Sequence, residues 1–283
     1  MSTRALVLGG GGITGIAWEI GLLHGLVEAG VDLTDADLVV GTSAGSVVGA
    51  QVTNGATTEA MYARQLAPLG TYGPEPTAVI GAAVTARWIW TGLRSGRDLE
   101  ALGRRLGAYA VRAAASGRLP SEEERIAVVS RRLVSQEWPA RDLRVTAVDA
   151  QTGAFRVFGA DDGVPLARAV AASCAVPGVY PPVTIDGRRY IDGGTRSSAN
   201  ADLAAGHDRV VALTPIAAAV PRSRGAAAQL AGIGSAHTVV APDKPAREAI
   251  GRNVLDPAAR ARTARAGYAQ ARAVAGAVSE IWA

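Results

Sequence analysis

The sequence lacks the residues that mark a disulfide-bonded, membrane-spanning or metal-binding protein. Cys174 is the only cysteine, which excludes an intramolecular disulfide bond. No run of about 18 uncharged apolar residues predicts a transmembrane helix, and the apolar run at residues 5–8 is too short for a signal peptide. With three separated histidines and one cysteine, we expect no metal ion and no other cofactor. We therefore expect a cytoplasmic protein, free or in peripheral contact with a membrane.

Lysine is also nearly absent, and Lys244 is the only one among 29 basic residues. The arginines are scattered along the chain, and the formal net charge is only +4. This favours a solvated surface; attraction to an anionic membrane is the alternative, and nucleic acid is not an expected partner. The 283 residues, 48% of them hydrophobic, can fill one large core without a linker, so we expect a single domain over residues 1–283.

Short apolar strands alternate with helical segments along the chain. In residues 14–29, apolar residues recur at helical spacing, and Ser121 with Glu124 forms a capping box that predicts a helix to about residue 136. The expected strands are 5–8, 38–40, 143–149, 154–158, 183–185, 188–191, 209–213 and 238–241, and further helices are expected at 46 onward, at 165 to before 177 and within 256–283. This alternation predicts an α/β fold, a three-layer α/β/α sandwich with a mostly parallel central sheet.

One segment, residues 68–96, is harder to assign. It contains three prolines and the aromatic run Trp88-Ile89-Trp90, which follows Arg87. One interpretation is an inserted lid or an apolar patch that contacts lipid. The alternative is a helix that packs on the core or lines an acyl pocket, and the choice between lid and core stays open for residues 78–93.

The pattern Gly41-x-Ser43-x-Gly45 stands between an apolar strand and a helix. This is the context of a nucleophile elbow, in which a tight turn holds a serine hydroxyl out of the backbone. The following helix favours negative charge that develops near its amino terminus. Ser43 is therefore a candidate nucleophile; the alternative is an ordinary turn of small residues that packs a helix against a sheet.

A second glycine-rich turn, residues 9–15, follows the first strand. Its glycines expose backbone N–H groups at the start of a helix, where they can bind an oxyanion or a phosphate. Gly10-x-Gly12-x-x-Gly15 also fits a dinucleotide-binding fingerprint, which requires an acidic residue at the end of the second strand. The nearby aspartates all precede that strand, so nucleotide binding is the weaker interpretation.

Together these motifs resemble the patatin-like phospholipase family. The glycine motif Gly10–Gly15, the turn at 41–45, the proline-bearing segment 172–177 and Asp192-Gly193-Gly194 follow the family's order within about residues 5–215. The resemblance implies that Ser43 is the nucleophile and Asp192 its base, with no histidine needed. It also implies an oxyanion hole made by amides around Gly10, Gly11 and Gly12. The remaining motif positions are Gly15, Gly41, Gly45, Gly193 and Gly194.

The implied activity is hydrolysis of acyl esters of lipids, in which an acyl group passes to Ser43 and water activated at Asp192 releases it. A methyl group at Gly11 or Gly12 is expected to lower turnover with little effect on unfolding temperature. Thr14 stands where the family often has arginine or lysine, which favours neutral esters over phospholipids as substrates.

Two alternatives use the same motifs differently. One is a catalytically weak lipid-binding or regulatory protein on the same scaffold, which would not require both Ser43 and Asp192. The other is an α/β-hydrolase with a Ser-Asp-His triad that includes His207 or His237. That fold places several strands before its nucleophile, whereas Ser43 follows only one earlier strand.

Overall fold

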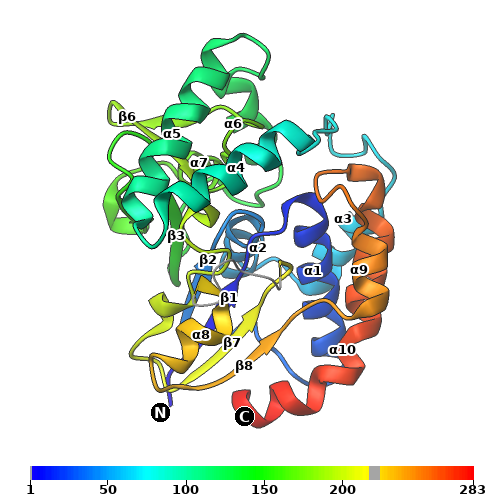
Figure 1. The fold of residues 1–283 in the computed structure, drawn as a ribbon. Helices are drawn as coiled ribbons and strands as arrows, with labels where there is room; N and C mark the ends of the chain where they lie inside the picture. Colours follow the sequence, from blue (N-terminus) through cyan, green and yellow to red (C-terminus); the bar gives the residue numbers. More distant parts are fainter. Residues whose placement is uncertain (1, 217–223) are drawn as a thin grey trace.

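The computed structural model describes residues 2–216 and 224–283 and folds them around one central sheet (Figure 1). Its strands are β1 Arg4–Leu8, β2 Leu38–Gly41, β3 Asp142–Asp149, β4 Phe155–Phe158, β5 Val183–Ile185, β6 Arg188–Asp192, β7 Arg209–Leu213 and β8 Ala236–Val240. They are ordered β5-β6-β3-β2-β1-β7-β8, with β4 also paired to β3. Strands β3, β2, β1, β7 and β8 are parallel, and β4, β5 and β6 join through antiparallel pairs. The predicted mostly parallel sheet is confirmed.

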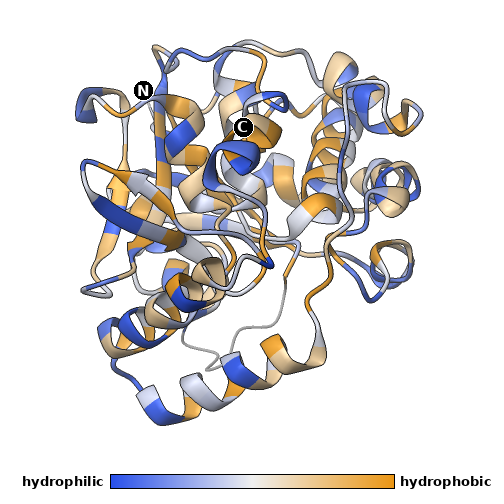
Figure 2. Cartoon of the chain, turned by 90° about the horizontal axis from the view of Figure 1, so that it is seen from above, coloured by the Kyte–Doolittle hydropathy of each residue, from blue (hydrophilic) through white to orange (hydrophobic). Residues whose placement is uncertain are grey.

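The helices cover both faces of this sheet. They are α1 Gly12–Glu28, α2 Ala44–Thr53, α3 Thr58–Leu66, α4 Ala82–Ser95, α5 Leu99–Ala115, α6 Glu122–Ser130, α7 Leu166–Ser173, α8 Ala226–Ala231, α9 Lys244–Ile250 and α10 Arg260–Trp282. Hydrophobic and hydrophilic residues alternate along many of these helices, as expected for helices with one buried face (Figure 2). No helix within the described ranges is long and apolar enough to cross a bilayer.

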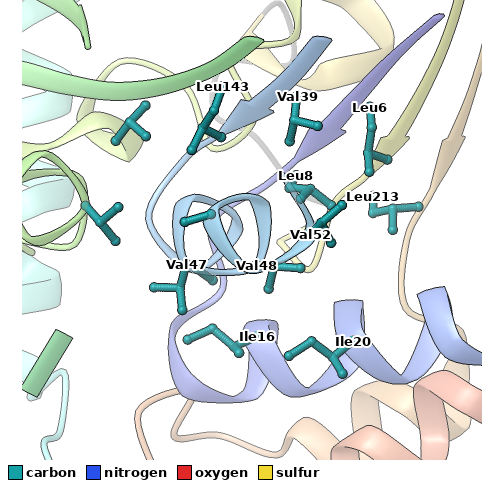
Figure 3. Close-up of a cluster of buried hydrophobic side chains, with 14 of the residues drawn as sticks. Leu6, Leu8, Ile16, Ile20, Val39, Val47, Val48, Val52, Leu143 and Leu213 are labelled. Carbon is teal, nitrogen blue, oxygen red and sulfur yellow. The ribbon is translucent and has the colours of Figure 1, made fainter. Parts of the chain in front are cut away.

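Alternating side chains of the parallel strands enter two different cores. In β1, Leu6 and Leu8 pack into the larger core with residues of α1, α2 and α10 (Figure 3). Ala5 and Val7 face the opposite side and pack with residues of α8. Helix α5 packs against β3 and β6 in a third cluster. Because successive strand residues point to opposite faces, this arrangement confirms the predicted three-layer sandwich.

Most of α1 is buried, and α10 lies directly against it. Trp18 Nε1 donates a 2.9 Å hydrogen bond to Gln270 Oε1. The two helix backbones can approach closely because Gly21 has no side chain. An added Cβ there would lie 2.0 Å from the Ala264 carbonyl oxygen. This packing fixes the amino-terminal end of α1, which carries the glycine-rich turn.

Several helices differ from what the sequence predicts. Helix α6 has the predicted capping box but ends at Ser130. Arg132, just beyond it, forms a partly buried ion pair with Glu75 at 3.2 Å, a tertiary contact that the local sequence does not reveal. Helices α3, α5, α8 and α9 were not predicted. Asp98 caps α5 by accepting a 2.8 Å hydrogen bond from the Ala101 N–H.

Candidate active site

Ser43 occupies a sharp turn between β2 and α2. Its φ of +52° and ψ of −112° are strained for a residue with a side chain, and such conformations cost about 1–3 kcal/mol. Only Asp186 and Asn200 share a positive φ among the described non-glycine residues. Backbone strain of this kind clusters at functional sites, so it supports the interpretation of the turn as a nucleophile elbow.

Close packing around the turn requires glycine on both sides of Ser43. A Cβ at Gly45 would lie 2.0 Å from the Leu8 carbonyl oxygen, and a Cβ at Gly41 would lie 2.5 Å from the backbone of α2. The Gly45 N–H also donates a 3.0 Å hydrogen bond to the Gly9 carbonyl. The serine turn and the glycine-rich turn are therefore joined directly.

Asp192 is the last residue of β6 and reaches the same edge of the sheet. Its strand pairs with β3 so that Asp192 lies opposite Ala147, two residues beyond the partner of Gly41 at the end of β2. Its N–H donates a 3.0 Å hydrogen bond to the Ala175 carbonyl. Its carboxylate accepts a 2.7 Å hydrogen bond from the Gly194 N–H, and the Ser43 hydroxyl lies near enough to lower the pKa of this carboxyl group. The structure thus brings together the two residues that the sequence proposed as nucleophile and base.

The environment of Asp192 makes its carboxylate a stronger base than an exposed one. The residue is only 5% exposed, and this burial raises the pKa of Asp192 to about 6. The Gly194 N–H, the Ser43 hydroxyl and the charge of Arg125 each lower this pKa, but burial has the larger effect. A carboxyl group with this pKa is ionised at neutral pH and can still accept a proton readily.

The glycine-rich turn lies beside Ser43, but its three predicted oxyanion donors are not equivalent. A Cβ added to Gly10 would lie 3.6 Å from Ser43 Cβ. The Gly10 N–H, however, already donates a 2.7 Å hydrogen bond to the Ser198 carbonyl. Within the described residues, the N–H groups of Gly11 and Gly12 donate no such bond. The N–H groups of Gly11 and Gly12, at the positive end of α1, therefore remain as the candidate donors of the oxyanion hole.

One cavity of about 350 Å³ connects these groups. Ser43, Asp192, Gly10, Gly11 and Gly12 all line it. Its apolar wall consists of Ile80, Trp88, Leu102, Leu106, Val176, Pro177, Ile216, Val254 and Leu255, and its other polar residues are Thr195, Arg196, Ser197, Ser198 and Arg224. A mostly apolar cavity with a few convergent polar groups is typical of a site for an organic substrate.

Asn200 positions both halves of this site, and no sequence pattern singled it out. Its fully buried side-chain amide donates to Thr42 Oγ1 at 3.0 Å and to the Ser197 carbonyl at 2.9 Å. A longer bond of 3.4 Å reaches the Gly193 carbonyl. Asn200 therefore links the residue before the nucleophile to the residue after the base, although it is more than 150 residues from Thr42.

The histidines lie away from this edge of the sheet. His207 precedes β7 and His237 is the second residue of β8, so both stand at the amino-terminal ends of parallel strands. Ser43 follows the carboxyl-terminal end of β2, and neither histidine lines the cavity. The geometry therefore does not support a Ser-Asp-His triad. In the part of the chain that the structure describes, no group of three His, Cys, Asp or Glu residues is arranged to hold a metal ion.

Comparison with known proteins identifies the family. A model of patatin-like phospholipases matches residues 6–205, more than half of the chain. The chain belongs to the patatin-like phospholipase family, as the resemblance predicted, and this membership supports lipid acyl hydrolase activity. A search of curated proteins gave no match.

The chain is also similar to two solved structures. VipD from Legionella pneumophila has 14% identity and a TM-score of 0.48, with 98% of this chain and 67% of that chain covered. The type III effector protein ExoU has 18% identity and a TM-score of 0.42, with 99% of this chain and 53% of that chain covered. The chain thus spans about half the length of the ExoU chain.

Proposed function

We propose that this protein hydrolyses acyl esters of lipids, with Ser43 as nucleophile and Asp192 as general base. The meeting of the strained Ser43 turn and the buried Asp192 carboxylate in one cavity carries the proposal. A serine hydroxyl is a weak nucleophile at neutral pH and needs an adjacent base. A binding protein on the same scaffold would need neither a strained serine nor a base with a raised pKa.

Each proton in the proposed reaction moves through Asp192. The carboxylate accepts the proton of Ser43 Oγ as this oxygen attacks the ester carbonyl carbon. The tetrahedral intermediate then breaks the ester C–O bond, and Asp192 returns the proton to the departing alcohol. A water molecule next gives its proton to Asp192 and attacks the acyl-serine, which releases the carboxylic acid and restores the Ser43 hydroxyl.

The amides of Gly11 and Gly12 would stabilise the oxyanion in both tetrahedral intermediates. These residues line the cavity at the first turn of α1, where backbone N–H groups have no partner within the helix. Removal of one such donor commonly reduces kcat by about 10²–10³-fold. The apolar wall from α4 and α5 would hold the acyl chain, because burial of each CH₂ group contributes about 0.8 kcal/mol.

Hydrolysis of p-nitrophenyl esters of graded chain length tests this proposal. We expect turnover by the wild-type protein, none by Ser43→Ala, and a loss of about 10⁴-fold or more in Asp192→Asn. Equal turnover by wild type and Ser43→Ala would contradict the assignment of the nucleophile. Circular dichroism of both variants controls for loss of the fold.

We also propose that α4, within residues 68–96, contacts the membrane that holds the substrate. Its outer face exposes Ile89 and Leu93, 60% and 78% accessible, together with Trp90. Arg87 and Arg94 flank this face and stack on Trp90 at 5.7 and 4.7 Å. No acidic residue occurs from 76 to 97. An apolar helix face with arginines at its border suits an anionic lipid surface.

The inner face of the same helix forms part of the cavity. Trp88 lines the cavity, and its Nε1 donates a 3.1 Å hydrogen bond to the Pro177 carbonyl. The segment therefore borders the site with one face and is exposed on the other. In this position a lipid ester can move from the membrane surface into the cavity along one helix.

Sedimentation with phosphatidylglycerol-containing vesicles tests this contact. The double variant Ile89→Ser, Leu93→Ser should bind at least about tenfold more weakly than wild type, because burial of each of these side chains contributes about 1.5–3 kcal/mol. Val134→Ser, at an exposed position beyond α6, is the matched control. Unchanged binding of the double variant would contradict membrane contact through α4 and leave the hydrolysis proposal untouched.

A further inference from the structure

Three charged side chains line the cavity, and the charges of two of them are already accounted for. Asp192 is the proposed base. Arg196 is neutralised by Asp202, with which it forms two hydrogen bonds of 2.9 and 2.6 Å. The third, Arg224, has no acidic partner among the described residues.

The lack of a counter-ion for Arg224 does not depend on the segment that precedes it. Residues 217–223 contain no aspartate or glutamate, so they cannot supply a carboxylate. The Arg224 guanidinium donates one hydrogen bond, of 3.1 Å, to the Gly96 carbonyl at the end of α4. Burial lowers the pKa of this guanidinium, as expected for a cation that is partly removed from water. Most of its five N–H donors remain available to a ligand in the cavity.

We propose that Arg224 binds a phosphate group on the alcohol part of the substrate, an inference that rests on the proposed ester hydrolysis. The apolar part of the cavity wall, which includes Trp88, Leu102 and Leu106, suits the acyl chain. A planar guanidinium pairs with two phosphate oxygens at once, which an ammonium group does not do. A substrate that carries both parts supplies the charge that Arg224 lacks and the apolar surface that the wall can cover.

The position of Thr14 removes the argument for a neutral head group. Its side chain is fully buried, and its hydroxyl lies 3.4 Å from the Gly11 carbonyl and 3.3 Å from the Val254 carbonyl. Thr14 does not line the cavity, so the absence of a cation at this position does not determine the charge of the substrate site. Arg224 supplies that charge from a segment more than 200 residues further along the chain.

Two soluble esters that differ only in phosphate test the role of Arg224. We compare kcat/KM for dihexanoyl phosphatidic acid and dihexanoylglycerol, used below their aggregation limits. Arg224→Gln should lower the ratio of the two values at least about tenfold, mainly through KM of the phosphate ester, and Arg224→Lys should lower it less. Arg118→Gln, at an exposed position beyond α5, should leave the ratio unchanged. Equal losses of kcat/KM on both esters would overturn the proposal. Arg224 would then have only a structural role, as the hydrogen-bond donor to the Gly96 carbonyl.

Binding of hexyl phosphate, measured by calorimetry, separates this inference from the proposed catalysis. The wild-type protein should bind it, and Arg224→Gln should bind it at least about tenfold more weakly. This result would support the anion site even if neither ester were hydrolysed, in which case the hydrolysis proposal alone would fail. Equal affinity of the two proteins for hexyl phosphate would overturn the role of Arg224 whatever the activity.

Discussion

The backbone N–H of Ser43 donates a 2.8 Å hydrogen bond to the side-chain oxygen of Ser173, the last residue of α7. Both residues are buried. Two residues further on, the Ala175 carbonyl accepts the hydrogen bond from the Asp192 N–H. The last residue of α7 and the segment that follows it therefore hold the proposed nucleophile and the proposed base together.

We predict that Ser173→Ala weakens both stability and activity. The substitution leaves the buried Ser43 N–H without an acceptor, which costs about 1–3 kcal/mol. The strained turn would also lose one of the contacts that hold it. Urea unfolding and ester turnover measure the two effects, and Ser116→Ala, at an exposed position, is the control. Identical behaviour of the two variants would show that the bond to Ser173 does not support the turn.

Activity should depend on pH through Asp192. The group acts as a base only when ionised, and burial raises its pKa to about 6. We therefore predict that kcat/KM on a neutral ester rises with pH and reaches half of its upper limit near pH 6. A profile that is flat through this range, or that has its midpoint near 4, would contradict the assignment of Asp192 as the base.

Asp192→Asn should remove activity and yet stabilise the protein at high pH. The pKa rises from 3.8 to about 6 on folding, so the folded state binds this proton more tightly than the unfolded state does. The resulting stabilisation is fully present below about pH 4 and is lost as pH rises through about 6. The difference amounts to about 3 kcal/mol at most. Asparagine stays neutral, so its advantage over aspartate should grow between these pH values.

Urea unfolding of wild type and Asp192→Asn at pH 4 and pH 8 measures this effect. Glu19 is also fully buried, and burial raises its pKa well above the usual value. Its contribution to stability has the same sign, but it is present in both proteins and cancels in the difference. A difference in unfolding free energy that is the same at both pH values would contradict the predicted burial of the Asp192 charge.

Short-range patterns predicted the parts of the fold that the local sequence determines. The strand and turn around Ser43 depend on neighbouring glycines, and the hairpin at Asp186-Gly187 depends on a two-residue turn; both are present. Asn200 and Arg224 could not be found in this way, because their partners are distant in sequence and only the fold brings them close.

The glycine-rich turn shows where the sequence-based expectation was wrong. We expected a methyl at Gly11 or Gly12 to leave the unfolding temperature nearly unchanged. A Cβ at Gly11 would lie 2.5 Å from Pro215 Cβ, and one at Gly12, where φ is +62°, would lie 2.7 Å from the Val254 carbonyl oxygen. Contacts this short require the neighbouring chain to move, so loss of stability accompanies loss of turnover.

Gly10→Ala and Gly12→Ala should therefore behave differently. At Gly10 the nearest neighbours of an added Cβ are 3.6 Å away, which is ordinary contact. We predict that Gly10→Ala keeps the wild-type unfolding temperature, whereas Gly12→Ala lowers it by several degrees, about 1–3 kcal/mol. Differential scanning calorimetry measures this, with ester turnover alongside. Equal unfolding temperatures would show that the backbone at Gly12 is not constrained as described.

The most direct test of the whole account is the site of covalent labelling by a fluorophosphonate, located by mass spectrometry of the peptides. An activated serine attacks phosphorus as it attacks an ester carbonyl, so we predict a single labelled residue, Ser43. Labelling should be absent in Ser43→Ala and slower by orders of magnitude in Asp192→Asn, with both variants folded. A label on another serine, or unchanged labelling of Asp192→Asn, would contradict the proposed Ser43–Asp192 pair.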